Sequence, residues 1–134
     1  MANQIYGTAR ELYLTSGGLN WTSDTIKAVL VDTGAYTPDF VLDDFLADIA
    51  AGARIATSAA LSSKTVTGGV ADAADVVFTA VSGVSVEAIV LYKDTGLDTT
   101  SNLIAYIDTA TGLPVTPSGG DITITWDAAG IFRL

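Results

Sequence analysis

The stretch that decides the fold is Val84–Asp108, which reads VSVEAIVLYK at 84–93, DTGLDTTS at 94–101 and NLIAYID at 102–108. Two apolar runs rich in β-branched residues flank a polar segment, which is the pattern of two antiparallel strands joined by a loop. From Ala88 to Tyr92 the apolar residues are continuous rather than alternating, so both faces of this strand are expected to be covered. The stretch therefore predicts a hairpin in the middle of a sheet.

Further strands are predicted on both sides of this hairpin. In Thr25–Val31, Ile26, Ala28 and Leu30 point to one face, and Val29 and Val31 point to the other. The last predicted strand, Asp121–Trp126, alternates with Ile122, Ile124 and Trp126 facing inward. Shorter strands are expected at Arg54–Ser58, at Lys64–Val70 with a turn or bulge at Gly68-Gly69, and at Val76–Thr79.

One short amphipathic helix is predicted over residues 39–50. Pro38 precedes it, Asp39 suits the N-cap, and apolar residues recur at helical spacing at Val41, Leu42, Phe45, Leu46 and Ile49. Thr8–Leu14 fits either a strand or one helical turn, and we favour the strand. Residues 1–6 are interpreted as an extended arm.

Length and pattern together predict a single domain. A chain of 134 residues is long enough to bury a core of its own. About seven or eight short strands with turn signals between them favour an antiparallel β-sandwich or a jelly-roll-like domain. The predicted fold class is therefore mainly β, with the single helix at 39–50.

Composition removes several classes of function. The chain has no cysteine and no histidine, so disulfides, thiolate chemistry and a Ser/His/Asp triad are excluded. With 15 acidic and 6 basic residues the net charge is −9, which disfavours a nucleic-acid partner. The first residues lack the basic and apolar regions of a leader, and no run approaches the roughly 20 apolar residues of a membrane helix. We expect no membrane partner and synthesis in the cytoplasm.

Carboxylates are the remaining candidates for chemistry, in three groups. Asp43, Asp44 and Asp48 are candidates for a cation site, but a solvated helix face explains them as well. Asp72 and Asp75 have the make-up of a glycosidase pair, and Asp94–Asp98 resembles part of a calcium loop. Turn capping is favoured for Asp72 and Asp75, and the segment at 94–98 lacks the alternating acidic ligands and the closing Glu of an EF-hand. Ser62-Ser63-Lys64 is interpreted as a turn rather than a catalytic dyad. The sequence thus predicts no enzyme, no cofactor and no metal site.

The aromatic residues leave a carbohydrate-binding role open. A platform for stacking sugars is one interpretation, and packing in the core or at an interface is the favoured one. Trp126 is expected in the core because it alternates with Ile122 and Ile124. The residues considered for the platform are Trp21, Trp126, Tyr6, Tyr13 and Tyr36.

Several segments, in order and spacing, resemble small structural proteins encoded in the head gene clusters of tailed phages. They begin with the run WTSDTIKAVL at Trp21–Leu30 and continue through Tyr36–Asp39 and the acidic segment after it. The remaining matching segments are Ser58–Leu61, Val66–Gly69, Ala74–Phe78, Ala88–Lys93, Leu103–Asp108, Ile122–Trp126 and Gly130-Ile131. The resemblance covers nearly the whole chain.

This resemblance implies a capsid decoration, or cement, protein. Proteins of that type bind the outer surface of an expanded phage head at capsomer junctions and stabilise it. The implied partners are the major capsid protein and further copies of the chain, as a dimer or trimer, on the outside of the virion. Two alternatives stay open: a phage tail or fibre-attachment protein, and a carbohydrate-binding β-sandwich module.

The contact residues are predicted in segments outside regular structure. These segments are the N-terminal arm, the loop Thr33–Pro38 and the loop Thr109–Gly120, which hold apolar and aromatic side chains. The predicted interface residues are Ile5, Tyr6, Ala35, Tyr36, Leu113 and Val115.

Overall fold

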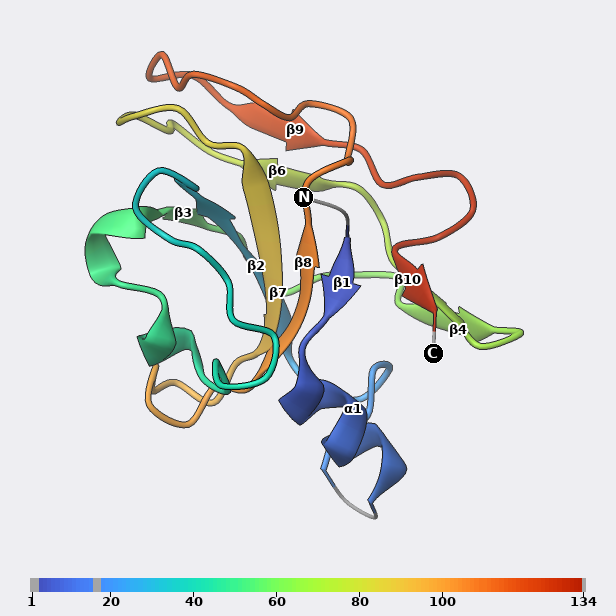
Figure 1. Cartoon of the computed structure of the whole chain (residues 1–134). Helices are drawn as coiled ribbons and strands as arrows, with labels where there is room; N and C mark the ends of the chain where they lie inside the picture. Colours follow the sequence, from blue (N-terminus) through green and yellow to red (C-terminus); the bar gives the residue numbers. More distant parts are fainter. Residues whose placement is uncertain (1–2, 16–17, 134) are drawn as a thin grey trace.

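The computed structural model describes residues 3–15 and 18–133, and its centre is a five-stranded antiparallel sheet in the order β1-β8-β7-β2-β3 (Figure 1). The predicted hairpin forms β7 and β8, paired with Ile89 opposite Ile107 and Val90 opposite Tyr106. Every residue of these two strands except Lys93 is buried, as the continuous apolar run predicts. The strand bounds are β1 (Gln4–Ile5), β8 (Leu103–Ile107), β7 (Ala88–Lys93), β2 (Ile26–Val31) and β3 (Arg54–Thr57).

The two faces of this sheet belong to two separate hydrophobic clusters. In β2, Ile26, Ala28 and Leu30 lie in the first cluster, whereas Val29 and Val31 lie in the second. This division confirms the two faces predicted for the strand. The sheet is therefore a buried central layer with a cover on each side.

Two smaller sheets cover the first face. One pairs β6 (Val76–Phe78) with β9 (Ile122–Ile124), and the other has the order β10-β5-β4, made of Phe132–Arg133, Val70–Asp72 and Thr65–Thr67. Phe78, Ile124 and Trp126 bring large side chains from this layer into the first cluster. Figure 1 shows β6 and β9 over one end of the central sheet and β4 and β10 beside the other. The layers resemble a sandwich, but the second one is split and the sandwich is not closed.

The second face is covered by residues 32–53 rather than by a sheet. Tyr36, Leu46, Ile49 and Ala53 from this segment are buried in the second cluster. Its regular structure is limited to two 3-10 turns, η1 (Leu46–Asp48) and η2 (Ala51–Ala53).

The helix predicted over residues 39–50 is wrong. Asp39 Oδ1 accepts the N–H groups of Val41 and Leu42, as an N-cap does. Asp48 Oδ2, however, accepts the N–H groups of Asp44 and Phe45, which a helix begun at Asp39 would bond to its own carbonyls. Such local bonds compete with helix formation. The apolar residues at helical spacing consequently separate, with Leu46 and Ile49 buried but Val41 and Leu42 exposed.

The one α-helix among the described residues is α1 (Gly7–Leu14), where a strand was favoured. Ala9 is fully buried and Tyr13 packs against the first cluster, which fits the spacing of one helical turn. Leu14, which would alternate inward with Leu12 in a strand, is 87% exposed. The helical alternative for Thr8–Leu14 therefore holds, and the favoured strand is wrong.

The predicted N-terminal arm is part of the folded body where the structure describes it. Gln4 and Ile5 form β1 at the edge of the central sheet, opposite Tyr106 and Ala105. Tyr6 is fully buried. Residues 1–2 lie outside the described residues.

The predicted fold class is confirmed: the protein is mainly β, with antiparallel sheets and one short helix. The described residues form ten strands, because Lys64–Val70 divides into β4 and part of β5 and the ends of the chain add β1 and β10. Among these residues, no helix reaches the length and apolar content that a membrane crossing requires.

Candidate functional site: a groove between two sheet edges

The most distinctive surface feature is a groove between β1 and β10. Each of these strands is at the edge of its sheet, and Gln4, Ile5, Phe132 and Arg133 line the same hollow. Edge strands carry backbone groups without a strand partner on their outer side and are natural sites for contact with another chain. We name the space between them the β1–β10 groove.

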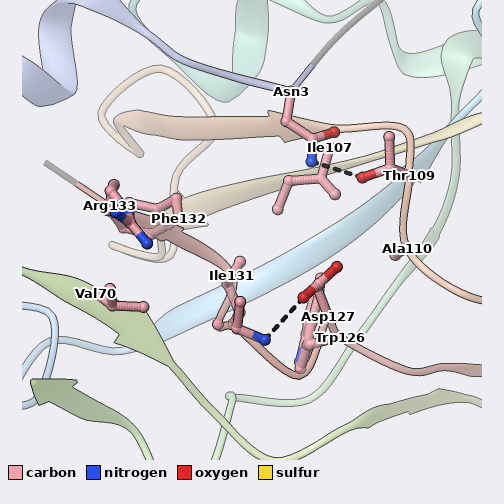
Figure 2. A pocket seen from close by; sticks show the side chains of 12 residues that line it. Asn3, Val70, Ile107, Thr109, Ala110, Trp126, Asp127, Ile131, Phe132 and Arg133 are labelled. Carbon is pink, nitrogen blue, oxygen red and sulfur yellow. Dashed lines mark hydrogen bonds between the residues drawn. The ribbon is translucent and has the colours of Figure 1, made fainter.

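The groove is formed by four adjoining hollows of about 260, 250, 380 and 210 Å³ that share lining residues. Figure 2 shows the first, with Phe132 and Arg133 on one side and Asn3, Ile107 and Thr109 on the other. The Asn3 Nδ2 group donates a 2.7 Å hydrogen bond to Thr109 Oγ1, which ties the start of β1 to the end of β8. The groove thus has a structured wall on each side.

The chain enters β10 through a position that requires glycine. Gly130 has a φ of +109°, and a Cβ atom there would lie 2.2 Å from Val70 Cγ1. The next residue, Ile131, donates its N–H to the Ala71 carbonyl over 2.8 Å. The Phe132 ring then packs edge-on against Trp21, with 5.2 Å between ring centroids. These contacts fix β10 against β5 and leave its outer edge facing the groove.

The two arginines of the groove distinguish it electrostatically. Lys27 pairs with Asp94 at 2.9 Å, Arg54 with Asp98 at 3.3 Å and Lys93 with Asp24 at 3.5 Å. Lys64 donates to the Asp24 carbonyl. In the part of the chain that the structure describes, Arg10 and Arg133 form no ion pair, and both line the groove. The groove therefore holds two arginines against one acidic lining residue, Asp127, which leaves it locally positive on a chain of net charge −9.

The rim of the groove is apolar. Leu14 of α1 and Val66 of β4 are 87% and 55% exposed, and they border neighbouring hollows. Tyr13 lies between them with a buried hydroxyl that has no partner among the described residues. Burial, with the charge of Asp24, raises the pKa of Tyr13 to about 12. The groove combines exposed hydrocarbon with positive charge, which suits an acidic and apolar partner segment.

The acidic residues considered for catalysis or metal binding have local structural roles. Asp72 Oδ1 accepts the N–H of Ala73 at 2.9 Å, and Asp75 Oδ1 accepts that of Trp126 at 3.1 Å. Asp94 and Asp98 pair with Lys27 and Arg54. Residues 3–15 and 18–133 bring no three metal-ligating side chains together in a group that would hold an ion. Asp72 thus bonds within its own turn, whereas Asp75 bonds to the backbone just after the end of β9 rather than capping a turn.

The aromatic side chains pack inside the molecule rather than forming a platform. Trp21 and Trp126 are buried, and their Nε1 groups donate to the Asp72 and Ala74 carbonyls at 3.1 and 3.0 Å. Tyr6 and Tyr36 are buried in the second cluster. The packing interpretation is confirmed for these four rings.

The predicted interface residues are dispersed. Tyr6 and Tyr36 are enclosed by this chain's own side chains, so they offer no surface to a partner. Ile5 is buried at the wall of the groove. Ala35 is exposed and Leu113 and Val115 are half-buried, so contacts through these three residues stay a prediction.

Arg10, Phe132 and Arg133 were not predicted as site residues. They lie near opposite ends of the chain, and periodicity describes single elements rather than which elements meet. A partial signal exists in Arg133, because it is a charged residue within the otherwise apolar run Ile131–Leu134.

Comparison with known proteins adds no family assignment: no family model matches the chain, and a search of curated proteins finds no match.

Proposed function

We propose that the chain is a virion structural protein of the capsid decoration, or cement, type, which binds the outer surface of a phage head at capsomer junctions. The observation that carries the proposal is the central sheet buried on both faces, which fixes surrounding loops where Ala35 is exposed and Leu113 and Val115 are half-buried. Adhesion requires rigid, complementary surface and no reacting groups. The identity of the partner, the major capsid protein of a phage head, rests on the sequence resemblance.

The body of the molecule suits repeated attachment to a shell. A sheet buried on both faces holds the surrounding loops in fixed positions, so little order is lost on binding. Symmetry repeats each contact around the shell, and modest area per copy becomes effective through multivalency. The net charge of −9 suits the outside of a shell, away from packaged DNA. We place the shell contact at the loops that carry Ala35, Leu113 and Val115.

A tail or fibre-attachment protein would use the same kind of surface but would be present in a different number of copies per particle. Cement proteins are present in hundreds of copies and tail components in small rings. The carbohydrate-binding alternative gains no support, because Trp21, Trp126 and Tyr36 are buried and offer no stacking face.

The test is to co-express the chain with the major capsid protein of the phage that encodes it and to sediment the assembled shells. We expect the chain to sediment with the shells at a stoichiometry approaching that of the capsid protein. Ala35→Asp should reduce the bound fraction, whereas Leu97→Asp, at a 63% exposed site in another loop, should not. Absence from the shells would contradict the proposal, and a few copies per particle would favour the tail alternative.

A further inference from the structure

A second surface feature complements the groove. Residues 39–44, which read DFVLDD, form a turn that we name the acidic tip. Its two central side chains are strongly exposed, Val41 at 79% and Leu42 at 74%. Large apolar side chains are seldom left so open at adjacent positions without a partner. Apart from Leu14, these are the most exposed large apolar residues of the described chain.

The acidic tip is held in shape by its own hydrogen bonds. Asp39 Oδ1 accepts the N–H groups of Val41 at 3.0 Å and Leu42 at 2.9 Å, and the Asp43 N–H donates to the Asp39 carbonyl at 2.9 Å. Asp43 Oδ2 is engaged by Tyr36 and by the Asp39 N–H. The side chain of Asp44 has no such partner among the described residues. The tip therefore presents two apolar side chains beside a free carboxylate in a preformed shape.

We propose that the acidic tip of one copy of this protein docks in the β1–β10 groove of a second copy. Charge and hydrophobicity match in this arrangement. Arg10 and Arg133 line the groove and form no ion pair within the described chain, and the Asp44 carboxylate forms none either. Val41 and Leu42 have an apolar counterpart in Leu14 and Val66 at the rim. One contact would thus cover both the acidic tip and the β1–β10 groove, which are exposed in a single copy.

The position of the tip allows two copies to dock reciprocally. The Gly7 N–H at the start of α1 donates to the Phe40 carbonyl over 2.7 Å, so the tip adjoins α1. Figure 1 shows residues of this segment beside the start of that helix. Arg10 lies one turn further along α1 and lines the groove. A two-fold axis near α1 would place each tip at the other copy's groove, which closes the pair.

The inference concerns the isolated chain and does not depend on shell binding. The experiment is sedimentation velocity of the purified protein at low ionic strength, across micromolar to submillimolar concentrations. We expect a mass above that of the 13.7 kDa monomer, and weaker association as salt increases. Leu42→Asp should shift the species to monomer, whereas Leu97→Asp should not.

A charge exchange identifies the two surfaces that meet. Arg133→Glu and Asp44→Lys should each weaken self-association at least tenfold, because each places like charges together at both contacts of the pair. Mixing the two variants should restore association as a one-to-one complex, since one contact is then native and the other has exchanged charges. Both residues changed in these variants are outside the buried core, and circular dichroism and the unfolding midpoint verify that each variant is folded.

A monomeric wild-type protein at every concentration would overturn the inference. So would association that Arg133→Glu and Asp44→Lys leave unchanged, or a mixture of the two that fails to associate. Because shells are absent from this experiment, its failure leaves the proposed shell binding to be judged by the co-sedimentation result alone.

Discussion

At the scale of single residues, a chain of hydroxyl groups links the central sheet to its loop cover. The Tyr36 hydroxyl donates to Asp43 Oδ2 over 2.7 Å, and the hydroxyls of Tyr6 and Tyr36 are 2.8 Å apart. Because the Tyr36 hydroxyl hydrogen is used in the bond to the carboxylate, the Tyr6 hydroxyl must be the donor in its bond to Tyr36. Desolvation by burial raises the pKa of both tyrosines well above the ordinary value. The order of donors makes the two residues unequal.

Tyr36→Phe should destabilise the protein more than Tyr6→Phe. Removing the Tyr36 hydroxyl leaves the buried Tyr6 hydroxyl without an acceptor and takes a donor from Asp43, which should cost about 1–3 kcal/mol. Removing the Tyr6 hydroxyl leaves the bond from Tyr36 to Asp43 intact and should cost about 0.5–1.5 kcal/mol. Urea unfolding of the two variants measures the difference. Equal losses, or a larger loss for Tyr6→Phe, would contradict this assignment of donors.

Gly130→Ala should displace β10. The new Cβ would meet Val70 Cγ1 at 2.2 Å and the Ala71 carbonyl oxygen at 3.3 Å, on a backbone with φ of +109°. Gly119→Ala is the matched control, since Gly119 has a φ of +90° but no atom within 4 Å of a Cβ. Strain alone costs about 1–3 kcal/mol, and overpacking adds about 1–3 kcal/mol at residue 130. Thermal unfolding should show the larger loss for Gly130→Ala, and indistinguishable losses would argue against a close contact there.

At the scale of elements, sequence reasoning succeeded where burial determines the residue pattern. The continuous run Ala88–Tyr92 and the alternation of Ile122, Ile124 and Trp126 report covered faces directly, and the structure has both. The acidic segment failed because two principles conflict there. Its apolar spacing is helical, but its aspartates bond to nearby backbone N–H groups and stabilise successive turns.

Asp48→Ala should therefore loosen the cover of the second face. Asp48 Oδ2 accepts the N–H groups of Asp44 at 2.8 Å and Phe45 at 2.9 Å, just before the turn that buries Leu46. Losing a cap of this kind costs about 0.5–2 kcal/mol. Asp44→Ala is the control, expected within about 0.5 kcal/mol of wild type. Hydrogen exchange at residues 44–49 should accelerate in the first variant only, and equal protection in both would contradict the capping role.

The groove could not be predicted from the sequence, for a different reason. Its walls are two short edge strands from opposite ends of the chain, and β10 has only two residues. Strands this short carry no periodicity. Their positions follow from pairing with β8 and β5, which is decided by the whole sheet order. The position of the candidate site therefore depends on the order of strands in the sheets, whereas most of the strands that support it can be predicted from the sequence.

At the scale of the whole molecule, the two covers of the central sheet differ in kind. Strands cover the first face, and an aspartate-rich segment covers the second. All five tyrosines, Tyr6, Tyr13, Tyr36, Tyr92 and Tyr106, have pKa values raised first by desolvation. Four of them, all but Tyr13, lie in the second cluster. This distribution makes one layer of the protein sensitive to alkali.

Stability should fall steeply in alkali. A tyrosine whose folded pKa exceeds the unfolded value of about 10 contributes stability that is complete below that pH. The contribution is lost as pH rises from there through the folded pKa, which for Tyr13 is about 12, because the unfolded chain releases the proton first. Lys27, whose pKa is raised by its hydrogen bond to Asp94, adds an effect of the same sign. Urea midpoints at about pH 8 and about pH 11 should therefore differ markedly, with the lower midpoint in alkali.

The absorbance of ionised tyrosine distinguishes the contribution of the tyrosines to this loss of stability from the contribution of Lys27. In the folded protein, ionisation should be delayed beyond pH 10 or so and should then rise together with unfolding, because exposure restores the ordinary pKa. Tyr36→Phe should be less stable at neutral pH but should lose less further stability in alkali, since it removes the hydroxyl that both Tyr6 and Asp43 contact. Tyrosines that titrate fully near pH 10 while the sheet stays folded would show that they are not sealed from water. The second face would then be a loosely closed cover, and its loop would not hold the acidic tip in a fixed shape.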